Sequence, residues 1–153
     1  MDIELVHFFD ATVTLDPPVD IGQTPQGIRQ IINIIGGTVE GERINGRILN
    51  SGADWRLIKE DGSAFLDTRY AMETHDGAVI YIQNIGFRHG PPAVLEKLAK
   101  GEDADPNSYY FRSTPVLETD TKNKKYAWVN HTIFLATGAR LADAVKLTVY
   151  EVK

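Results

Sequence analysis

The sequence contains no cysteine, so it can form neither a disulfide bond nor a thiolate nucleophile or thiolate metal site. It also lacks a basic tract. Its formal net charge of -5 disfavours a nucleic-acid or anionic-membrane partner, because phosphate groups attract basic surfaces. No apolar run approaches the length of a membrane span, and the N-terminus lacks the basic and apolar regions of a secretory signal. We therefore expect a cytoplasmic protein with no nucleic-acid partner and no membrane partner.

Motifs for metal and cofactor chemistry are also missing. The four histidines do not pair at a spacing that suits a metal ion, and no His-x-His or His-Glu-x-x-His sequence occurs. The chain has no Gly-x-Ser-x-Gly motif, no phosphate loop and no dinucleotide-binding fingerprint. These absences predict a site without metal and without cofactor.

The chain does contain many short β-branched and aromatic segments separated by glycine and proline. Its 153 residues suit one domain that spans residues 1–153. Residues 93–100 form the one good helix candidate, followed by Gly101. The strands predicted by pattern are 4–15, 27–35, 38–41, 43–49, 54–58, 64–75, 78–87, 109–114, 116–119, 125–137 and 145–152, with a loop at 19–26. Such a pattern is typical of an all-β antiparallel barrel or sandwich, and strands with glycine bends favour the barrel.

The segments 64–75 and 78–87 are joined by Asp76-Gly77, which predicts a β-hairpin. Strand alternation places Asp67, Arg69 and Glu73 on one face of the first strand. If that face is exposed, it is a solvated charged surface. If it lines a lumen, Arg69 could bind a carboxylate or enolate oxygen and Glu73 could be a base. The direction of Arg69 distinguishes these alternatives.

Several motifs in this order resemble uncharacterised protein family 0311, also called domain of unknown function 3237. The clearest are Gly36-Gly-Thr-Val-Glu-Gly41, Ser51-Gly-Ala-Asp-Trp55, Leu66-Asp-Thr-Arg-Tyr70, Asp76-Gly-Ala-Val-Ile-Tyr81 and Tyr126-Ala-Trp-Val-Asn130. The resemblance covers nearly the whole chain, and Ser51 replaces a more usual glycine. It implies a small β-barrel similar to calycins and allene-oxide-cyclase-like barrels. Members lie among bacterial and fungal catabolic and biosynthetic genes, which implies small organic substrates. Related barrels bind apolar ligands or carry out cyclisation, isomerisation or lyase chemistry, an analogy of fold.

The aromatic segment 125–137 is a candidate cavity wall. As a strand it places Trp128 and Asn130 on one face with other aromatic residues, and an apolar wall with a few polar groups is typical of small-ligand pockets. The alternative is a packed core in which Asn130 bonds to the backbone. Both interpretations stay open.

The remaining candidates are spread over four segments. Asp54 could be an acid or base, or a turn residue that bonds to nearby amides, and Trp55 could stack on a ligand or belong to the core. Tyr81 could be a general acid or a structural tyrosine. Arg29 and Arg112 could select an anionic substrate or form structural ion pairs.

Three hypotheses result from these residues. The first is a cofactor-independent enzyme that moves protons on a hydrophobic carbonyl or carboxylate compound, with Asp54 or Glu73 as the base and Tyr81 as the acid. The second is a non-catalytic carrier that uses the same lumen. The third is a structural or oligomeric barrel with a packed interior. Exposed edge strands and the family analogy favour a homodimer.

Overall fold

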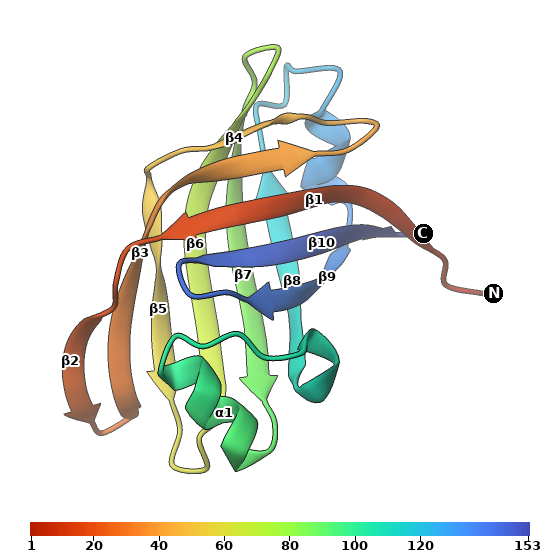
Figure 1. The fold of residues 1–153 in the computed structure, drawn as a ribbon. Helices are drawn as coiled ribbons and strands as arrows, with labels where there is room; N and C mark the ends of the chain where they lie inside the picture. Colours follow the sequence, from red (N-terminus) through yellow and green to blue (C-terminus); the bar gives the residue numbers. More distant parts are fainter.

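The strands of the chain close into an eight-stranded antiparallel β-barrel, as seen in a computed structural model that describes residues 1–153 (Figure 1). The predicted barrel is therefore confirmed. The elements are β1 (Leu5–Leu15), β2 (Val19–Thr24), β3 (Gly27–Glu40), β4 (Gly46–Ile48), β5 (Gly52–Ile58), β6 (Ala64–Thr74), β7 (Val79–His89), α1 (Pro92–Ala99), η1 (Pro106–Ser108), β8 (Tyr110–Glu118), η2 (Ala127–His131), β9 (Phe134–Arg140) and β10 (Ala144–Val152).

The two ends of the chain close the barrel. Strand order runs from β1 through β10, β9, β8, β7 and β6 to β4 and β5, then to β3, which pairs back with β1. Leu5 pairs with Val152, so the N- and C-terminal strands lie side by side (Figure 1). The hairpin of β2 and β3 extends beyond the barrel wall, because β2 pairs with β3 alone.

The predicted hairpin of β6 and β7 is confirmed. Asp76 and Gly77 form its turn, with Gly77 at a φ of 90° that favours glycine. Tyr70 and Met72 are buried inside the barrel, at 4% and 0% exposure. Alternation therefore turns Arg69 outward, and the charged face of β6 belongs to the outer surface.

The main core fills one part of the barrel interior. It consists of 20 buried residues from both halves of the chain, among them Phe8, Phe9, Ile34, Ile80 and Phe134. Phe8 and Phe134 stack with ring centres 5.5 Å apart. Because these large side chains occupy this part, free space remains in the part of the lumen nearer α1.

The one α-helix forms as predicted and covers one end of the barrel. Pro92 opens α1, where a missing N–H is harmless, and Gly101 follows its end with φ 75°. Leu98 packs in a small cluster with Tyr109 and Phe111 of the barrel. The helix therefore covers part of this end of the lumen.

Several sequence predictions of secondary structure were wrong, among them the separate strands 109–114 and 116–119, which form the single strand β8. Residues 19–24 were expected to be loop and form β2, because β3 offers them a pairing edge. Residues 27–35 and 38–41 were expected to be separate strands but form one strand, β3, which passes through Gly36 and Gly37.

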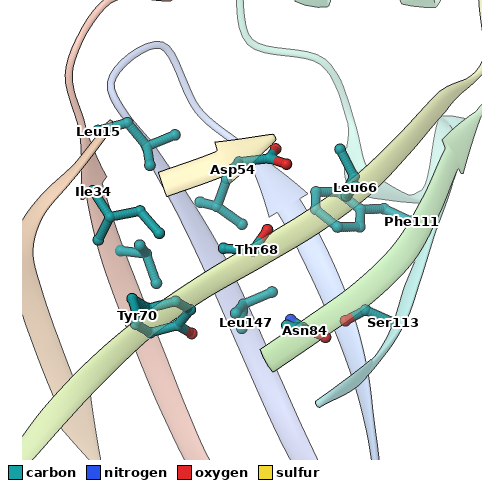
Figure 2. Close-up of a pocket in the computed structure, with 12 residues that line it drawn as sticks. Leu15, Ile34, Asp54, Leu66, Thr68, Tyr70, Asn84, Phe111, Ser113 and Leu147 are labelled. Carbon is teal, nitrogen blue, oxygen red and sulfur yellow. The ribbon is translucent and has the colours of Figure 1, made fainter. Parts of the chain in front are cut away.

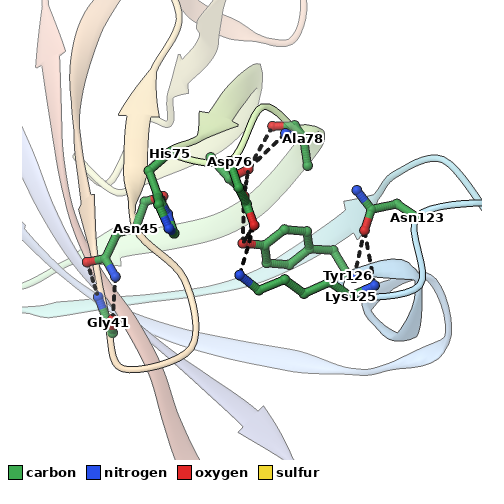
Figure 3. Close-up of polar contacts among 9 residues, drawn as sticks. Gly41, Asn45, His75, Asp76, Ala78, Asn123, Lys125 and Tyr126 are labelled. Atoms are coloured by element: carbon green, nitrogen blue, oxygen red, sulfur yellow. Dashed lines mark hydrogen bonds and ion pairs between the residues drawn. The ribbon is translucent and has the colours of Figure 1, made fainter.

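The segment 125–137 is not one strand, which is a further error. Residues Ala127–His131 form the 3₁₀-helix η2, and β9 begins only at Phe134. Side chains hold this shape: Asn123 Oδ1 accepts the backbone N–H groups of residues 125 and 126, and the Tyr126 hydroxyl donates to Asp76 (Figure 3). Hydrogen bonds of this kind compete with the backbone hydrogen bonds that pair one strand with another.

Candidate functional site

The lumen contains a mostly apolar cavity with a few polar groups. It has a volume of about 50 Å³, is partly open to solvent, and has eight hydrophobic residues among the twelve that line it (Figure 2). The lining residues are Val13, Leu15, Ile34, Asp54, Leu66, Thr68, Tyr70, Asn84, Phe111, Ser113, Val145 and Leu147. An apolar lining with a few polar groups is typical of a site for a small molecule.

Strand pairing places the polar groups of the cavity in one row. Asp54 of β5 pairs with Thr68 of β6, and Thr68 pairs with Asn84 of β7. Ser113 of β8 also points inward, opposite Gly86, one step from Asn84 along the inner face of β7. Because paired residues on one face of a sheet are neighbours, four adjacent strands present these side chains together.

Asp54 is the titratable group of the cavity wall. Its Oδ1 atom is buried and has no hydrogen-bond partner. Burial raises the pKa of Asp54 to about 6, although the charges of Arg56 and Arg88 act in the opposite direction. A carboxyl group with this pKa changes its protonation near neutral pH, as a group that takes and returns protons must do.

Two neutral polar groups beside Asp54 are also without partners. Asn84 Oδ1 and Ser113 Oγ are buried and make no hydrogen bond with the protein. Buried polar groups in proteins are rarely left unpaired. Tyr70 lines the cavity as well, and burial raises the pKa of its hydroxyl, so the phenol stays neutral. The lumen thus has hydrogen-bonding capacity that a ligand could use.

Among the three candidate catalytic residues, only Asp54 lines the cavity. Tyr81 lies on the outer face of β7 and is 37% exposed. Glu73 lies on the outer face of β6 and forms an ion pair with Arg47, with Nη2 and Oε1 3.0 Å apart. The structure therefore does not bring Tyr81 and Glu73 to Asp54, because each has the strand parity that faces away from the lumen.

The candidate ligand-binding arginines also lie outside the cavity. Arg29 donates to the backbone oxygen of Trp55 at 2.8 Å, and the Trp55 side chain is exposed. Arg69 pairs with Asp67, with Nε and Oδ1 3.6 Å apart. Arg112 donates to the preceding backbone oxygen at 2.9 Å. These side chains occupy the outer surface of the barrel.

Trp128 and Asn130 lie on η2 and have structural contacts. The Trp128 ring packs against Phe8 and Phe134, with ring centres 5.0 and 5.9 Å apart. The Asn130 amide accepts the backbone N–H of Thr119 at 2.8 Å and donates to its carbonyl oxygen at 3.1 Å. Neither residue lines the cavity, because the segment that carries them is not a strand.

Sequence reasoning missed the inward-facing polar residues. Asn84 shares the inner face of β7 with Ile80 and Ile82, and Thr68 shares that of β6 with Leu66. The signal was available: polar side chains embedded in the more apolar face of a strand are candidates for a lumen site. Arg69, Glu73 and Tyr81 were chosen as candidates instead, and they lie on the outer faces of β6 and β7.

Two further findings concern metals and membranes. No group of three or more histidine, cysteine, aspartate or glutamate side chains is arranged to hold a metal ion. No helix of the chain has both the length and the apolar character needed to cross a membrane.

The fold and the cavity define a small antiparallel β-barrel with a partly enclosed lumen. Residues 3–152 match the family described as protein of unknown function DUF3237, and the chain belongs to this family. The resemblance inferred from the motifs is therefore confirmed.

Three solved structures place the fold among known proteins. The conserved protein of unknown function from Rhodopseudomonas palustris is similar with a TM-score of 0.95 and 38% identity, covering 100% of this chain and 99% of that chain. A curated UPF0311 protein of the same species is 40% identical over 150 residues, 98% of this chain and 97% of its own length. A β-barrel like protein from Acinetobacter baumannii AYE has a TM-score of 0.87 and 44% identity, covering 100% and 98%. An enzyme from Penicillium herquei has a TM-score of 0.73 at 19% identity, covering 100% and 96%, a likeness of fold alone.

Proposed function

We propose that this barrel binds a small hydrophobic molecule bearing a carbonyl or carboxylate group, and that Asp54 moves a proton on that molecule. The observation that carries the proposal is the position of Asp54, a carboxyl group of pKa about 6 on the wall of an apolar cavity. A general base or acid works best when its pKa lies near the working pH. The reaction class is proton transfer: isomerisation, cyclisation or elimination without a cofactor.

The chemistry can be written with the groups of the cavity. The ionised Asp54 carboxylate takes a proton from the carbon beside the ligand carbonyl, and the C–H electron pair moves to give an enolate. The Asn84 amide N–H and the Ser113 hydroxyl can donate hydrogen bonds to the enolate oxygen. Protonated Asp54 then returns the proton to another atom of the ligand, which completes an isomerisation.

The likeness to the Penicillium herquei enzyme adds support by analogy of fold, because it shows that a barrel of this shape can serve an enzyme. The lining adds further support, because the unpartnered Ser113 hydroxyl can donate a hydrogen bond to a carbonyl oxygen whose apolar body lies against the cavity wall.

Proton exchange tests this function without knowledge of the natural substrate. Cyclohexanone and acetophenone are incubated with the protein in D2O, and loss of the α-proton signal is followed by NMR. We expect the wild-type protein to accelerate exchange by about 10²-fold or more, as general base catalysis allows. The rate should rise with pH through about 6, where Asp54 becomes ionised.

Matched variants assign the exchange to Asp54. Asp54→Asn should abolish the acceleration, whereas Glu73→Gln, which changes an outward carboxylate, should leave it intact. Equal exchange by wild type and Asp54→Asn would show that Asp54 is not the base. Ketone binding in the lumen without any acceleration would favour the carrier function instead.

We also infer that the chain forms a homodimer. The outer faces of β7 and β8 expose Val79, Phe87 and Val116 at 51%, 55% and 62%. These strands are paired neighbours, so the apolar side chains share one surface. Apolar surfaces of this kind often serve protein contacts, and a second copy of the chain is the partner proposed.

A further inference from the structure

Three inward-facing arginines, two of them buried, gather at the end of the lumen that α1 covers. Arg56 lies two residues after Asp54 on β5, Arg88 lies near the end of β7, and Arg140 ends β9. Arg56 and Arg88 are each only 8% exposed. Arg140 is half-buried, and its backbone N–H donates to the hydroxyl of Tyr109, which packs beneath α1. Strand alternation puts all three on inner faces.

None of the three guanidinium groups forms an ion pair. Arg56 donates from Nε and Nη2 to the neutral Oε1 of Gln30 at 3.1 and 2.6 Å. Arg140 Nη1 lies 3.4 Å from the backbone oxygen of Ala144. Arg88 Nε is buried without any partner. The cluster therefore keeps donor capacity that the protein does not use.

The carboxylates near the cluster are not paired with its guanidinium groups. Asp54, Asp20 and Asp143 are the carboxylates that act on these arginines, and none of them is in an ion pair with one. The pKa of Arg88 is lowered to about 10, mainly by burial and to a smaller extent by repulsion from Arg56 and Arg140. A buried cation without a paired anion is unfavourable, so an anion placed among the three would be stabilised.

We propose that Arg56, Arg88 and Arg140 form a carboxylate-binding subsite, and that the ligand of the lumen is an organic acid. The inference rests on the proposed function, since the acid's apolar body lies in the same cavity. Phe111 joins the two regions, because it lines the cavity and lies 6.0 Å from the Arg88 guanidinium. A guanidinium can bind a carboxylate through two parallel hydrogen bonds. The apolar lining suits an organic body better than a hydrated inorganic anion.

Calorimetric titration with three probes tests the subsite: cyclohexanecarboxylate, its neutral amide cyclohexanecarboxamide, and inorganic phosphate. We expect the wild-type protein to bind the carboxylate at least about tenfold more tightly than the amide or phosphate, as a charge-assisted pair allows. Arg88→Gln should weaken carboxylate binding by about 10- to 100-fold and leave amide binding unchanged. Arg112→Gln, which removes the same charge from the outer surface, should change neither.

Several results would overturn the subsite. The wild-type protein could fail to bind the acid, or could bind the amide or phosphate as tightly as the acid. Arg88→Gln and Arg112→Gln could also weaken carboxylate binding equally. If Arg88→Gln does not fold, Arg140→Gln replaces it, because Arg140 is only half-buried. Tight carboxylate binding without ketone proton exchange would retain the subsite and reject the catalytic role of Asp54, so the two failures are distinguishable.

Discussion

At the scale of single residues, the direction of a side chain decides its chemistry. Asp54 and Asp76 have the same carboxyl group, but burial raises the pKa of Asp54 to about 6. Hydrogen bonds from Lys125, Thr74 and Tyr126 hold the pKa of Asp76 well below its usual range. Only the first of these environments leaves a carboxyl group ready to exchange a proton near neutral pH.

Asp54 should make the folded protein less stable as the pH rises. Its folded pKa of about 6 exceeds the ordinary value of 3.8, so the folded state binds the proton more tightly than the unfolded state. Stability from this group is complete below pH 3.8 and is lost as the pH rises through about 6. Since one pKa unit corresponds to about 1.4 kcal/mol, the loss is at most roughly 3 kcal/mol.

Asp54→Asn should therefore be more stable than wild type at pH 7, by roughly 1–3 kcal/mol, and should lose this part of the pH dependence. Urea unfolding between pH 4 and 8 measures the difference, with Glu73→Gln as the surface control. A variant that is less stable than wild type at pH 7 would contradict the assigned environment of Asp54.

At the scale of elements, the barrel depends on close approaches between strands. Strand β3 passes β1 at the seam that closes the barrel, with Gly37 opposite Val13. Gly37 has φ 138°, and a Cβ atom there would lie 1.9 Å from the backbone oxygen of Thr12. At Gly36 the nearest atom to such a Cβ, the backbone oxygen of Ile48, is 3.9 Å away. The close approach of β1 therefore requires glycine at position 37 but not at position 36.

The glycine pair provides a matched test of the seam. Gly37→Ala should destabilise the protein by more than about 2 kcal/mol, because both φ and the space exclude a side chain. Gly36→Ala should change the free energy of unfolding by less than about 1 kcal/mol, since a strand tolerates alanine there. Denaturant unfolding measures both, and equal effects would be inconsistent with the seam geometry.

The contact between the β6–β7 turn and η2 is a second element-scale feature. The Tyr126 hydroxyl donates to both carboxylate oxygens of Asp76 at 2.9 and 3.1 Å, and Lys125 Nζ lies 2.8 Å from Oδ2 (Figure 3). Because the pKa of Asp76 is lowered, its stabilising effect is present above the ordinary value of 3.8 and is lost as the pH falls through the folded value.

Tyr126→Phe should destabilise the protein by about 1.5–3 kcal/mol near pH 7, the range for a hydrogen bond to a charged group. Tyr81→Phe, at an exposed position, should have almost no effect. Thermal or urea unfolding compares the two variants. If Tyr126→Phe also costs almost nothing, the hydroxyl does not anchor η2.

At the scale of the whole molecule, the charge distribution has two parts. The chain has a formal net charge of -5, yet three inward-facing arginines, two of them buried, lie at one end of its lumen. The net negative charge disfavours anion binding on the surface as a whole, whereas the arginines at the internal end favour an organic anion. The outer faces of β7 and β8 provide the separate apolar surface proposed for the homodimer.

The proposed homodimer is tested by measuring the oligomeric state of the protein in solution. Sedimentation or light scattering should show a dimer for wild type, and Phe87→Glu with Val116→Glu should yield a monomer, because charge is disfavoured in the core of an interface. Val19→Glu, at an exposed position of β2, is the control and should leave the dimer intact. A monomeric wild type, or equal dissociation in the control, would contradict this interface.

Much of the barrel could be predicted from the sequence, because strand formation depends on local patterns. Alternation, the Asp76-Gly77 turn and Pro92 before an apolar helix identified the β6–β7 hairpin and α1. Segment 125–137 failed because the bonds that hold η2 reach Asp76 and Thr119, which are distant in sequence. A window of neighbouring residues contains no sign of such partners.

The sequence by itself determined the strands, the family, and which residues of each strand share a face. Only the tertiary structure decided which face is inside, because barrel closure turns Thr68 and Tyr70 inward and Arg69 outward. Asp54 was recognisable as a candidate from the sequence. Its raised pKa depends on burial inside the barrel, and its neighbour Arg88 comes from another strand, whereas Arg56 shares its own strand face. Two residues adjacent in a strand point to opposite faces of the sheet, so a charged neighbour in sequence lies on the other face. The folded barrel, in contrast, places charged side chains from other strands next to a lumen residue.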